Sequence, residues 1–195
     1  KILSLVTSSN ASLVLHLAAK TDVDGCEKDK EQGINGDAWK INVEGTRNIV
    51  DACIKSKKKL IYVSTDFVFD GKKEKPYSEG DSPNPINWYA QTKYEGEKLV
   101  NESSLSWVIL RIAYPYRTNF PKRDFVRVLI DKLKNRENLE LVTDHIMTPT
   151  FVDDLSNVLD SIIRNNLTGV FHAVGSQFVS PFEAGIIIAN IFGFD

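Results

Sequence analysis

Apolar runs typical of buried strands alternate along this chain with segments whose apolar residues recur at helical spacing. The first run, 13–19, is continuous and ends in small residues, as expected of a parallel strand buried on both faces. A second run lies at 60–64, and segment 39–54 between them has the period of a helix. Strands that alternate with helices predict an α/β fold with a doubly wound parallel sheet and right-handed crossovers.

The rest of the chain continues this alternation. Further strands are expected at 107–112, 139–142 and 170–174, and further helices at 88–100, 125–133, 151–164 and 182–192. Ser180 is placed to cap the last helix, with Pro181 at its first position. A polar, turn-rich loop covers 70–87. Ligands bind at the carboxyl ends of the strands in such sheets, so the residues that follow the strands are the candidates for chemistry.

Composition narrows the possible functions. The 195 residues are 42% hydrophobic and 26% charged with a formal net charge of −2, which gives no reason to expect a nucleic-acid partner or an anionic membrane surface. No apolar stretch approaches the roughly 20 residues that cross a bilayer, and the chain opens without a secretory leader. Cys26 and Cys53 are expected to be reduced thiols of a cytoplasmic protein. Three scattered histidines without acidic or thiol partners predict no metal site.

Tyr89 and Lys93 are spaced i, i+4 on the expected helix 88–100 and therefore lie on one face within reach of each other. A phenol has a pKa near 10, and lowering it to about 7 requires roughly 4 kcal/mol of differential stabilisation, which nearby cations could supply. Tyr94 and Lys98 repeat the spacing. Because five residues of helix rotate a side chain by roughly 140°, the two pairs cannot face one site.

The surroundings of Tyr89 favour the first pair. Tyr89 comes directly after the proline-rich loop, where we expect its side chain to point into a cleft. The strand 60–64 ends in Ser64, Thr65 and Asp66, and a hydroxyl at that end can donate to a substrate carbonyl oxygen beside the phenol. Thr65 alone would more often bond to the local backbone, so the combination is what predicts a site.

Ordered motifs extend this pattern over most of the chain: LAAKTDVD at 17–24, NVEGTRN at 42–48, YVSTDFVFDG at 62–71, WYAQTKYEGE at 88–97, LRIAY at 110–114 and PTFVDDL at 149–155. They resemble the extended short-chain dehydrogenases and, within that family, the dTDP-4-dehydrorhamnose reductases. The resemblance implies a Rossmann-like, NAD(P)-binding fold. Residues 1–115 would be the remainder of the dinucleotide-binding domain with the catalytic helix. Residues 116–195 would be a mixed region with a small substrate-binding lobe and further sheet elements.

The resemblance also implies a part of the family pattern that this sequence does not contain. The glycine-rich phosphate loop has no counterpart here, and we expect roughly two βαβ units of about 30 residues each before Lys1. The residue that separates NADP from NAD lies in that part, so the cofactor is expected to be one or the other. The chain as it stands is expected to bind the cofactor poorly.

The implied activity is NAD(P)H-dependent reduction of a nucleotide-linked 4-keto sugar, as in dTDP-rhamnose biosynthesis. Tyr89 would donate the proton to the 4-keto oxygen, Lys93 would tune Tyr89 and hold the nicotinamide ribose, and Thr65 would orient the carbonyl. The resemblance places further residues along the cofactor: Ala18, Ala19, Thr21, Val63 and Ser64, with Tyr89 and Lys93. It places four residues near the substrate: Val23, Asp66, Phe67 and Tyr114. Asn42 would join a proton relay or act as a buried polar bridge. The implied partners are a nucleotide-sugar substrate and a second copy of the chain in a homodimer.

Three alternatives stand beside this hypothesis. The chain could be a non-catalytic module like the regulatory subunit of methionine adenosyltransferase, although Thr65 favours the reductases because the regulatory relatives tend to carry serine there. An epimerase of the same family stays open, since it uses the same tyrosine and lysine. A dehydratase is disfavoured because Phe67 stands where dehydratases carry a proton-transferring glutamate.

Overall fold

The structure is a computed structural model that describes residues 1–118, 121 and 123–194, and the chain divides into two compact units. The first unit comprises Lys1–Arg111 and Leu167–His172. The second unit comprises Ile112–Asn166 and the chain from Ala173 onward.

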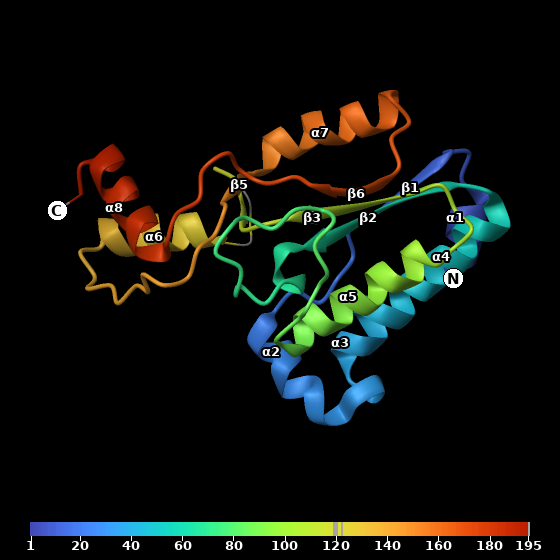
Figure 1. The fold of residues 1–195 in the computed structure, drawn as a ribbon, viewed down its shortest axis with the longest axis horizontal. Helices are drawn as coiled ribbons and strands as arrows, with labels where there is room; N and C mark the ends of the chain where they lie inside the picture. The colour runs from blue at the N-terminus through green and yellow to red at the C-terminus, as the bar shows by residue number, and fades with distance from the viewer. Residues whose placement is uncertain (119–120, 122, 195) are drawn as a thin grey trace. The chain divides into compact units, whose positions relative to one another are not determined.

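The first unit is built on a four-stranded sheet with the order β1-β2-β3-β6 (Figure 1). Its strands are β1 (Leu13–His16), β2 (Lys59–Thr65), β3 (Trp107–Ile112) and β6 (Gly169–His172). β1 pairs with β2 in parallel from Leu13↔Lys59 to His16↔Tyr62. β3 and β6 are also parallel, from Val108↔Gly169 to Arg111↔His172. This parallel sheet with flanking helices confirms the expected Rossmann-like α/β fold.

Helices of the first unit cover one face of this sheet (Figure 1). They are α1 (Ile2–Ser8), α2 (Val23–Asp29), α3 (Asp37–Trp39), α4 (Gly45–Ser56) and α5 (Trp88–Asn101). α4 and α5 lie side by side, each carrying the chain from one strand to the next, and α1 packs on α4. Shorter turns occur at Lys30–Asn35 and Asp66–Val68, which are 3₁₀, and at Lys40–Glu44, which is π-helical.

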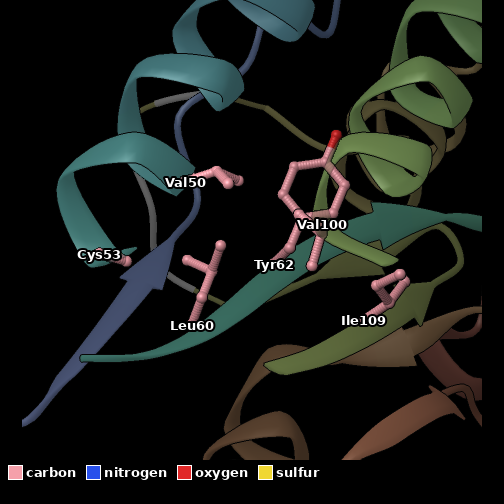
Figure 2. Close-up of a cluster of buried hydrophobic side chains, with 6 residues drawn as sticks. All are labelled: Val50, Cys53, Leu60, Tyr62, Val100 and Ile109. Carbon is pink, nitrogen blue, oxygen red and sulfur yellow. The ribbon is translucent and has the colours of Figure 1, made fainter. Parts of the chain in front are cut away.

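The core of the first unit forms where α4, α5 and the sheet meet. Figure 2 shows Val50 and Cys53 on α4, Leu60 and Tyr62 on β2, Val100 on α5 and Ile109 on β3. Leu60 and Tyr62 are two residues apart, so both side chains rise from the same face of β2. Burial of a large apolar side chain contributes roughly 1.5–3 kcal/mol, and this cluster fixes α5 against β2. The position of α5 decides where its first turn presents side chains.

The second unit contains a two-stranded sheet and three helices. β4 (Pro115–Tyr116) pairs in parallel with β5 (Thr150–Phe151). The helices are α6 (Phe125–Lys134), α7 (Val152–Arg164) and α8 (Pro181–Phe192). Leu129, Met147, Ala184 and Ile188 form the buried cluster between α6 and α8. The Ser180 Oγ accepts a hydrogen bond from the Glu183 amide at 3.1 Å, and the Glu183 carboxylate accepts one from the Ser180 amide at 2.7 Å. The expected cap of the last helix is therefore confirmed.

Two expectations about elements were wrong in detail. β1 ends at His16, and Leu15 is 38% exposed, so the strand is not buried on both faces. Segment 39–54 is helical as expected and contains the π-helical turn Lys40–Glu44. Segment 139–142 is not a strand: Leu139 and Leu141 pack into the α6–α8 cluster, and the Val142 carbonyl accepts from the Phe182 amide at the start of α8. In the part of the chain that the structure describes, no helix has the length and apolar character needed to span a membrane.

Candidate active site

Tyr89 lies in the first turn of α5. The helix begins after Asn87, whose Oδ1 accepts a hydrogen bond from the Ala90 amide at 2.8 Å, so the start of the helix is fixed by a cap. The Tyr89 side chain is only 8% exposed and packs in a cluster with Cys26 and Ala38. Phe67 presents its ring edgewise, with 5.9 Å between the ring centroids. Side chains from α2, α3 and the turn after β2 surround the ring, so most of the Tyr89 side chain is enclosed, and a cleft at its hydroxyl stays a prediction.

The hydroxyl of Tyr89 nevertheless reaches the carboxyl end of β2. Burial raises the pKa of Tyr89 to about 12, while a hydrogen bond with the Thr65 side chain lowers it and the charge of Asp66 raises it further. The Thr65 Oγ1 also donates to the Asp66 Oδ1 at 3.1 Å and accepts from the Phe67 amide at 3.2 Å. The structure therefore places the phenol near the end of β2 that carries Thr65, and the use of Thr65 to orient a substrate carbonyl stays a prediction.

Lys93 lies one turn further along α5 and is almost fully buried. Its Nζ donates a hydrogen bond to the Val63 carbonyl oxygen at 2.8 Å and lies 4.1 Å from the centroid of the Tyr62 ring. Burial lowers the pKa of Lys93 to about 7, against the opposing charge of Glu97. Burial raises the pKa of Tyr89, and its lowering by Lys93 together with a nicotinamide ring stays a prediction.

Three further residues expected near the substrate surround Tyr89. Val23 is the first residue of α2, which Asp22 caps by accepting from the Gly25 amide at 3.1 Å, and it packs on the Tyr89 cluster together with Phe67. Asp66 follows Thr65 directly, and burial raises its pKa to about 6. The site thus combines an apolar wall with one carboxyl group that is easily protonated.

Because the pKa of Asp66 is raised, removing its charge is predicted to increase the free energy of unfolding by an amount that depends on pH. An unfolded aspartate titrates near pH 3.9 and native Asp66 near pH 6, so the native state holds the extra proton between these values. The stability contributed by this carboxyl is therefore present below about pH 4 and is lost as the pH rises through 6. Asp66→Asn should raise the free energy of unfolding by about 1–3 kcal/mol near pH 8 and change it little near pH 4. Urea unfolding at both pH values measures this, and an equal effect at both would contradict the shift.

Asn42 is buried in the π-helical turn and uses its side chain as a bridge. Its Oδ1 accepts from the Lys20 amide at 2.8 Å, and its Nδ2 donates to the Lys20 carbonyl at 3.1 Å and to the Thr92 Oγ1 at 2.9 Å. These bonds connect the loop after β1 to α5. The bridge was one of the two roles expected for Asn42, and the proton relay stays a prediction.

The residues expected along a cofactor lie at the carboxyl ends of β1 and β2, which end at the same edge of the sheet because the strands are parallel neighbours. Ala18 and Thr21 are exposed in the loop after β1, and Ala19 is half-buried. Val63 offers its carbonyl to Lys93. The buried Ser64 Oγ has no hydrogen-bond partner among the described residues. Small side chains and a polar atom that lacks a protein partner fit a cofactor that brings its own hydrogen-bonding groups.

Tyr114 is the one expected site residue in the second unit. Its backbone has a positive φ of 41°, which is uncommon for a residue with a side chain. Its hydroxyl lies 2.9 Å from the His145 Nε2, and its ring meets Phe125 edgewise at a centroid distance of 5.8 Å. These contacts hold Tyr114 within its own unit, and its contact with a substrate stays a prediction.

The structure adds residues to the site that the sequence pattern did not single out. Tyr62 and Glu97 both act on Lys93, and Glu97 forms a buried ion pair with Arg111 at 2.7 Å. Glu97 stands at i+4 from Lys93, which was a usable signal. Cys26 and Ala38 pack under Tyr89, and nothing in their local sequence indicates this. Within residues 1–118, 121 and 123–194, no group of three or more His, Cys, Asp or Glu side chains could hold a metal ion.

Tyr89, Lys93 and Thr65 lie near the carboxyl edge of the parallel sheet of a Rossmann-like α/β protein. The chain belongs to the family of the RmlD substrate binding domain, whose model matches residues 1–195.

Particular relatives support this assignment. The dTDP-4-dehydrorhamnose reductase of Aggregatibacter actinomycetemcomitans is 31% identical over 96% of this chain and 63% of its own length. The bovine methionine adenosyltransferase 2 subunit beta is 31% identical over 92% of the chain and 54% of its own length. The crystal structure of dTDP-4-dehydrorhamnose reductase from Bacillus anthracis in complex with NADP superposes with a TM-score of 0.91 at 32% identity, covering 100% of this chain and 66% of that one. The chain therefore spans about two-thirds or less of the length of these relatives.

Proposed function

We propose that this chain provides the catalytic helix and substrate-binding residues of a reductase that uses NADPH or NADH to reduce the keto group of a nucleotide-linked 4-keto sugar. The observation that carries the proposal is the position of Tyr89 in the first turn of α5, with Lys93 one helical turn further and Thr65 at the carboxyl end of β2, close enough to Tyr89 to affect the pKa of its hydroxyl. Relatives named dTDP-4-dehydrorhamnose reductase match along most of the chain, which supports this substrate class.

Each residue has a defined task in this reaction. Tyr89 donates a proton to the carbonyl oxygen, and a pKa of about 12 keeps its hydroxyl protonated at neutral pH, which is the form that a proton donor needs. Thr65 orients the carbonyl beside the phenol. Lys93 would tune Tyr89 from one helical turn further along α5 and hold the nicotinamide ribose.

The cofactor supplies the hydride when it is bound. Residues at the ends of β1 and β2 would hold it: Ala18, Ala19, Thr21, Val63 and Ser64. The Ser64 Oγ, buried and without a partner among the described residues, supports this placement. Val23, Asp66 and Phe67 of the first unit would contact the sugar nucleotide, and the Phe67 ring, which meets Tyr89 edgewise, suits one face of a sugar ring.

The test is turnover by the full-length protein that contains this chain. We expect it to oxidise NADPH or NADH only when a 4-keto sugar nucleotide is present, with the new hydroxyl at C4 identified by NMR of the product. A matched reaction with the corresponding 4-hydroxy sugar nucleotide controls for oxidation without a keto group. If the protein binds both cofactor and sugar nucleotide but the absorbance of the reduced nicotinamide does not change, the proposed reduction is wrong.

A second candidate function is a non-catalytic regulatory module. One observation favours it: the methionine adenosyltransferase 2 beta subunits match the chain at 30–31% identity. A regulatory module should bind a nucleotide without turnover and should change the kinetics of a catalytic partner. Stable association with a methionine adenosyltransferase catalytic subunit, together with absent reduction, would support this candidate.

A further inference from the structure

Tyr62 touches Lys93 twice. Its hydroxyl donates a hydrogen bond to the backbone carbonyl oxygen of Lys93 at 3.2 Å, and its ring centroid lies 4.1 Å from the Lys93 Nζ. Tyr62 is fully buried, and Figure 2 shows its ring rising from β2 toward the helices with the hydroxyl at the far end. One side chain therefore contacts both the main chain and the ammonium group of the same lysine.

We propose that Tyr62 is a positioning residue for Lys93, which fixes the lysine backbone through its hydroxyl and keeps the buried amine charged through the face of its ring. The negative face of an aromatic ring attracts a cation, most strongly where water is excluded. The Lys93 amine lies over the face of the Tyr62 ring, and water is excluded from this contact because both side chains are buried. The value of this charge for catalysis rests on the proposed function, whereas the contact and its effect on the lysine do not.

The other titratable groups that face Lys93 do not offer it an unpaired negative charge. Glu97 on α5 favours the charged amine, but its carboxylate is already paired with Arg111 of β3. His16 of β1 faces the amine as well, and burial and the Lys93 charge lower its pKa to about 4, so the imidazole is neutral at physiological pH. Burial also raises the pKa of the Tyr62 hydroxyl, which stays protonated and donates. The ring and the Val63 carbonyl are thus the close contacts of the amine.

The close approach of Tyr62 to α5 depends on the glycine at position 96. A Cβ atom at Gly96 would meet the Tyr62 hydroxyl oxygen and lie 2.9 Å from the ring carbon that carries it. A residue with a side chain at position 96 would therefore push the ring away from α5. Glycine at this position lets the Tyr62 hydroxyl reach the helix main chain.

The experiment measures the Lys93 amine directly, by an NMR pH titration of the protein carrying ¹³C-labelled lysine, with Lys93→Met identifying the signal. Tyr62→Phe keeps the ring and should leave the Lys93 pKa within a few tenths of a unit. Difluorinated and pentafluorinated phenylalanine at position 62 keep the shape of the ring but withdraw its negative face. They should lower the Lys93 pKa stepwise by a total of about one unit. The charged fraction of Lys93 at neutral pH should then fall by several-fold.

A matched control lies on the same helix. Lys98 sits 4.7 Å over the Tyr94 ring with its side chain 40% exposed, so Tyr94→Leu should barely change the Lys98 pKa. The proposal fails if the Lys93 pKa is the same with phenylalanine and with pentafluorophenylalanine in folded protein. Because the titration needs no turnover, this failure is distinguishable from a failure of the proposed reduction. If reduction is observed, the alkaline limb of the kcat profile should move with the Lys93 pKa.

Discussion

Tyr89→Phe in the full-length protein should lower kcat for reduction of a 4-keto sugar nucleotide by a factor of about 10² to 10⁴, the usual contribution of a general acid. Phenylalanine keeps the ring that packs on Cys26, Ala38 and Phe67, so the fold should survive the change. Only the hydroxyl that bonds to Thr65 is lost. Cofactor affinity should change little, because the lost interaction belongs to the transition state. Steady-state kinetics and a fluorescence titration with the cofactor measure the two effects separately.

Tyr94→Phe is the control for this prediction. Tyr94 belongs to the same helix and repeats the spacing to a lysine, but its ring lies under the exposed amine of Lys98. We expect its kcat to stay within about a factor of two of the parent, since a surface hydroxyl takes no part in the reaction. Should Tyr94→Phe abolish activity while Tyr89→Phe retains it, the assignment of the helix face would be wrong.

Arg111→Met should lower the free energy of unfolding by about 3–5 kcal/mol, because it leaves the buried Glu97 carboxylate without its partner. The Arg111 and Glu97 side chains are 5% and 4% exposed and form two hydrogen bonds, at 2.7 and 3.0 Å. The guanidinium also lies 5.0 Å from the centroid of the Phe69 ring. Denaturant unfolding measures the loss, which comes mostly from the uncompensated charge.

The exposed pair of Glu95 and Lys98 on α5 is the matched control. Its side chains are 25% and 40% exposed, so Lys98→Met should cost less than about 1 kcal/mol. The double variant Glu97→Leu with Arg111→Met should recover much of the loss, since an apolar pair needs no neutralising partner. A cost for Arg111→Met no larger than that for Lys98→Met would show that the buried pair contributes nothing measurable.

Local sequence was sufficient to predict the elements that carry the proposed chemistry. The helix beginning at Trp88 and the strand ending at Thr65 follow from a helix start after a proline-rich loop and from a run of β-forming residues. Strand geometry then required that both ends meet at one edge of the sheet. Thr65 is close enough to Tyr89 to affect the pKa of its hydroxyl, and donation from Thr65 to a substrate carbonyl stays a prediction.

The environment of those side chains could not be predicted in the same way, because it depends on residues distant in the sequence. Tyr89 is buried by Cys26 and Ala38, which approach it from α2 and α3. Tyr62 and Lys93 are 31 positions apart and meet only after α5 has packed on β2. The apolar alternation at 139–142 resembles a strand, but no sequence pattern shows that the Val142 carbonyl bonds to the start of α8 instead. Burial of these groups, and hence their pKa values, became visible only with the packed fold.

The amide of Asn42 has a mechanical consequence. With three hydrogen bonds it ties the backbone of Lys20 to Thr92, and Thr92 lies between Tyr89 and Lys93 on α5. These hydrogen bonds therefore restrain the position of the loop that begins at Ala18 relative to α5, the helix that carries Tyr89. A nucleotide bound to this loop would therefore lie at a fixed position relative to the Tyr89 hydroxyl. A substitution that weakened the Asn42 hydrogen bonds would make that position less defined without changing Tyr89 or the nucleotide.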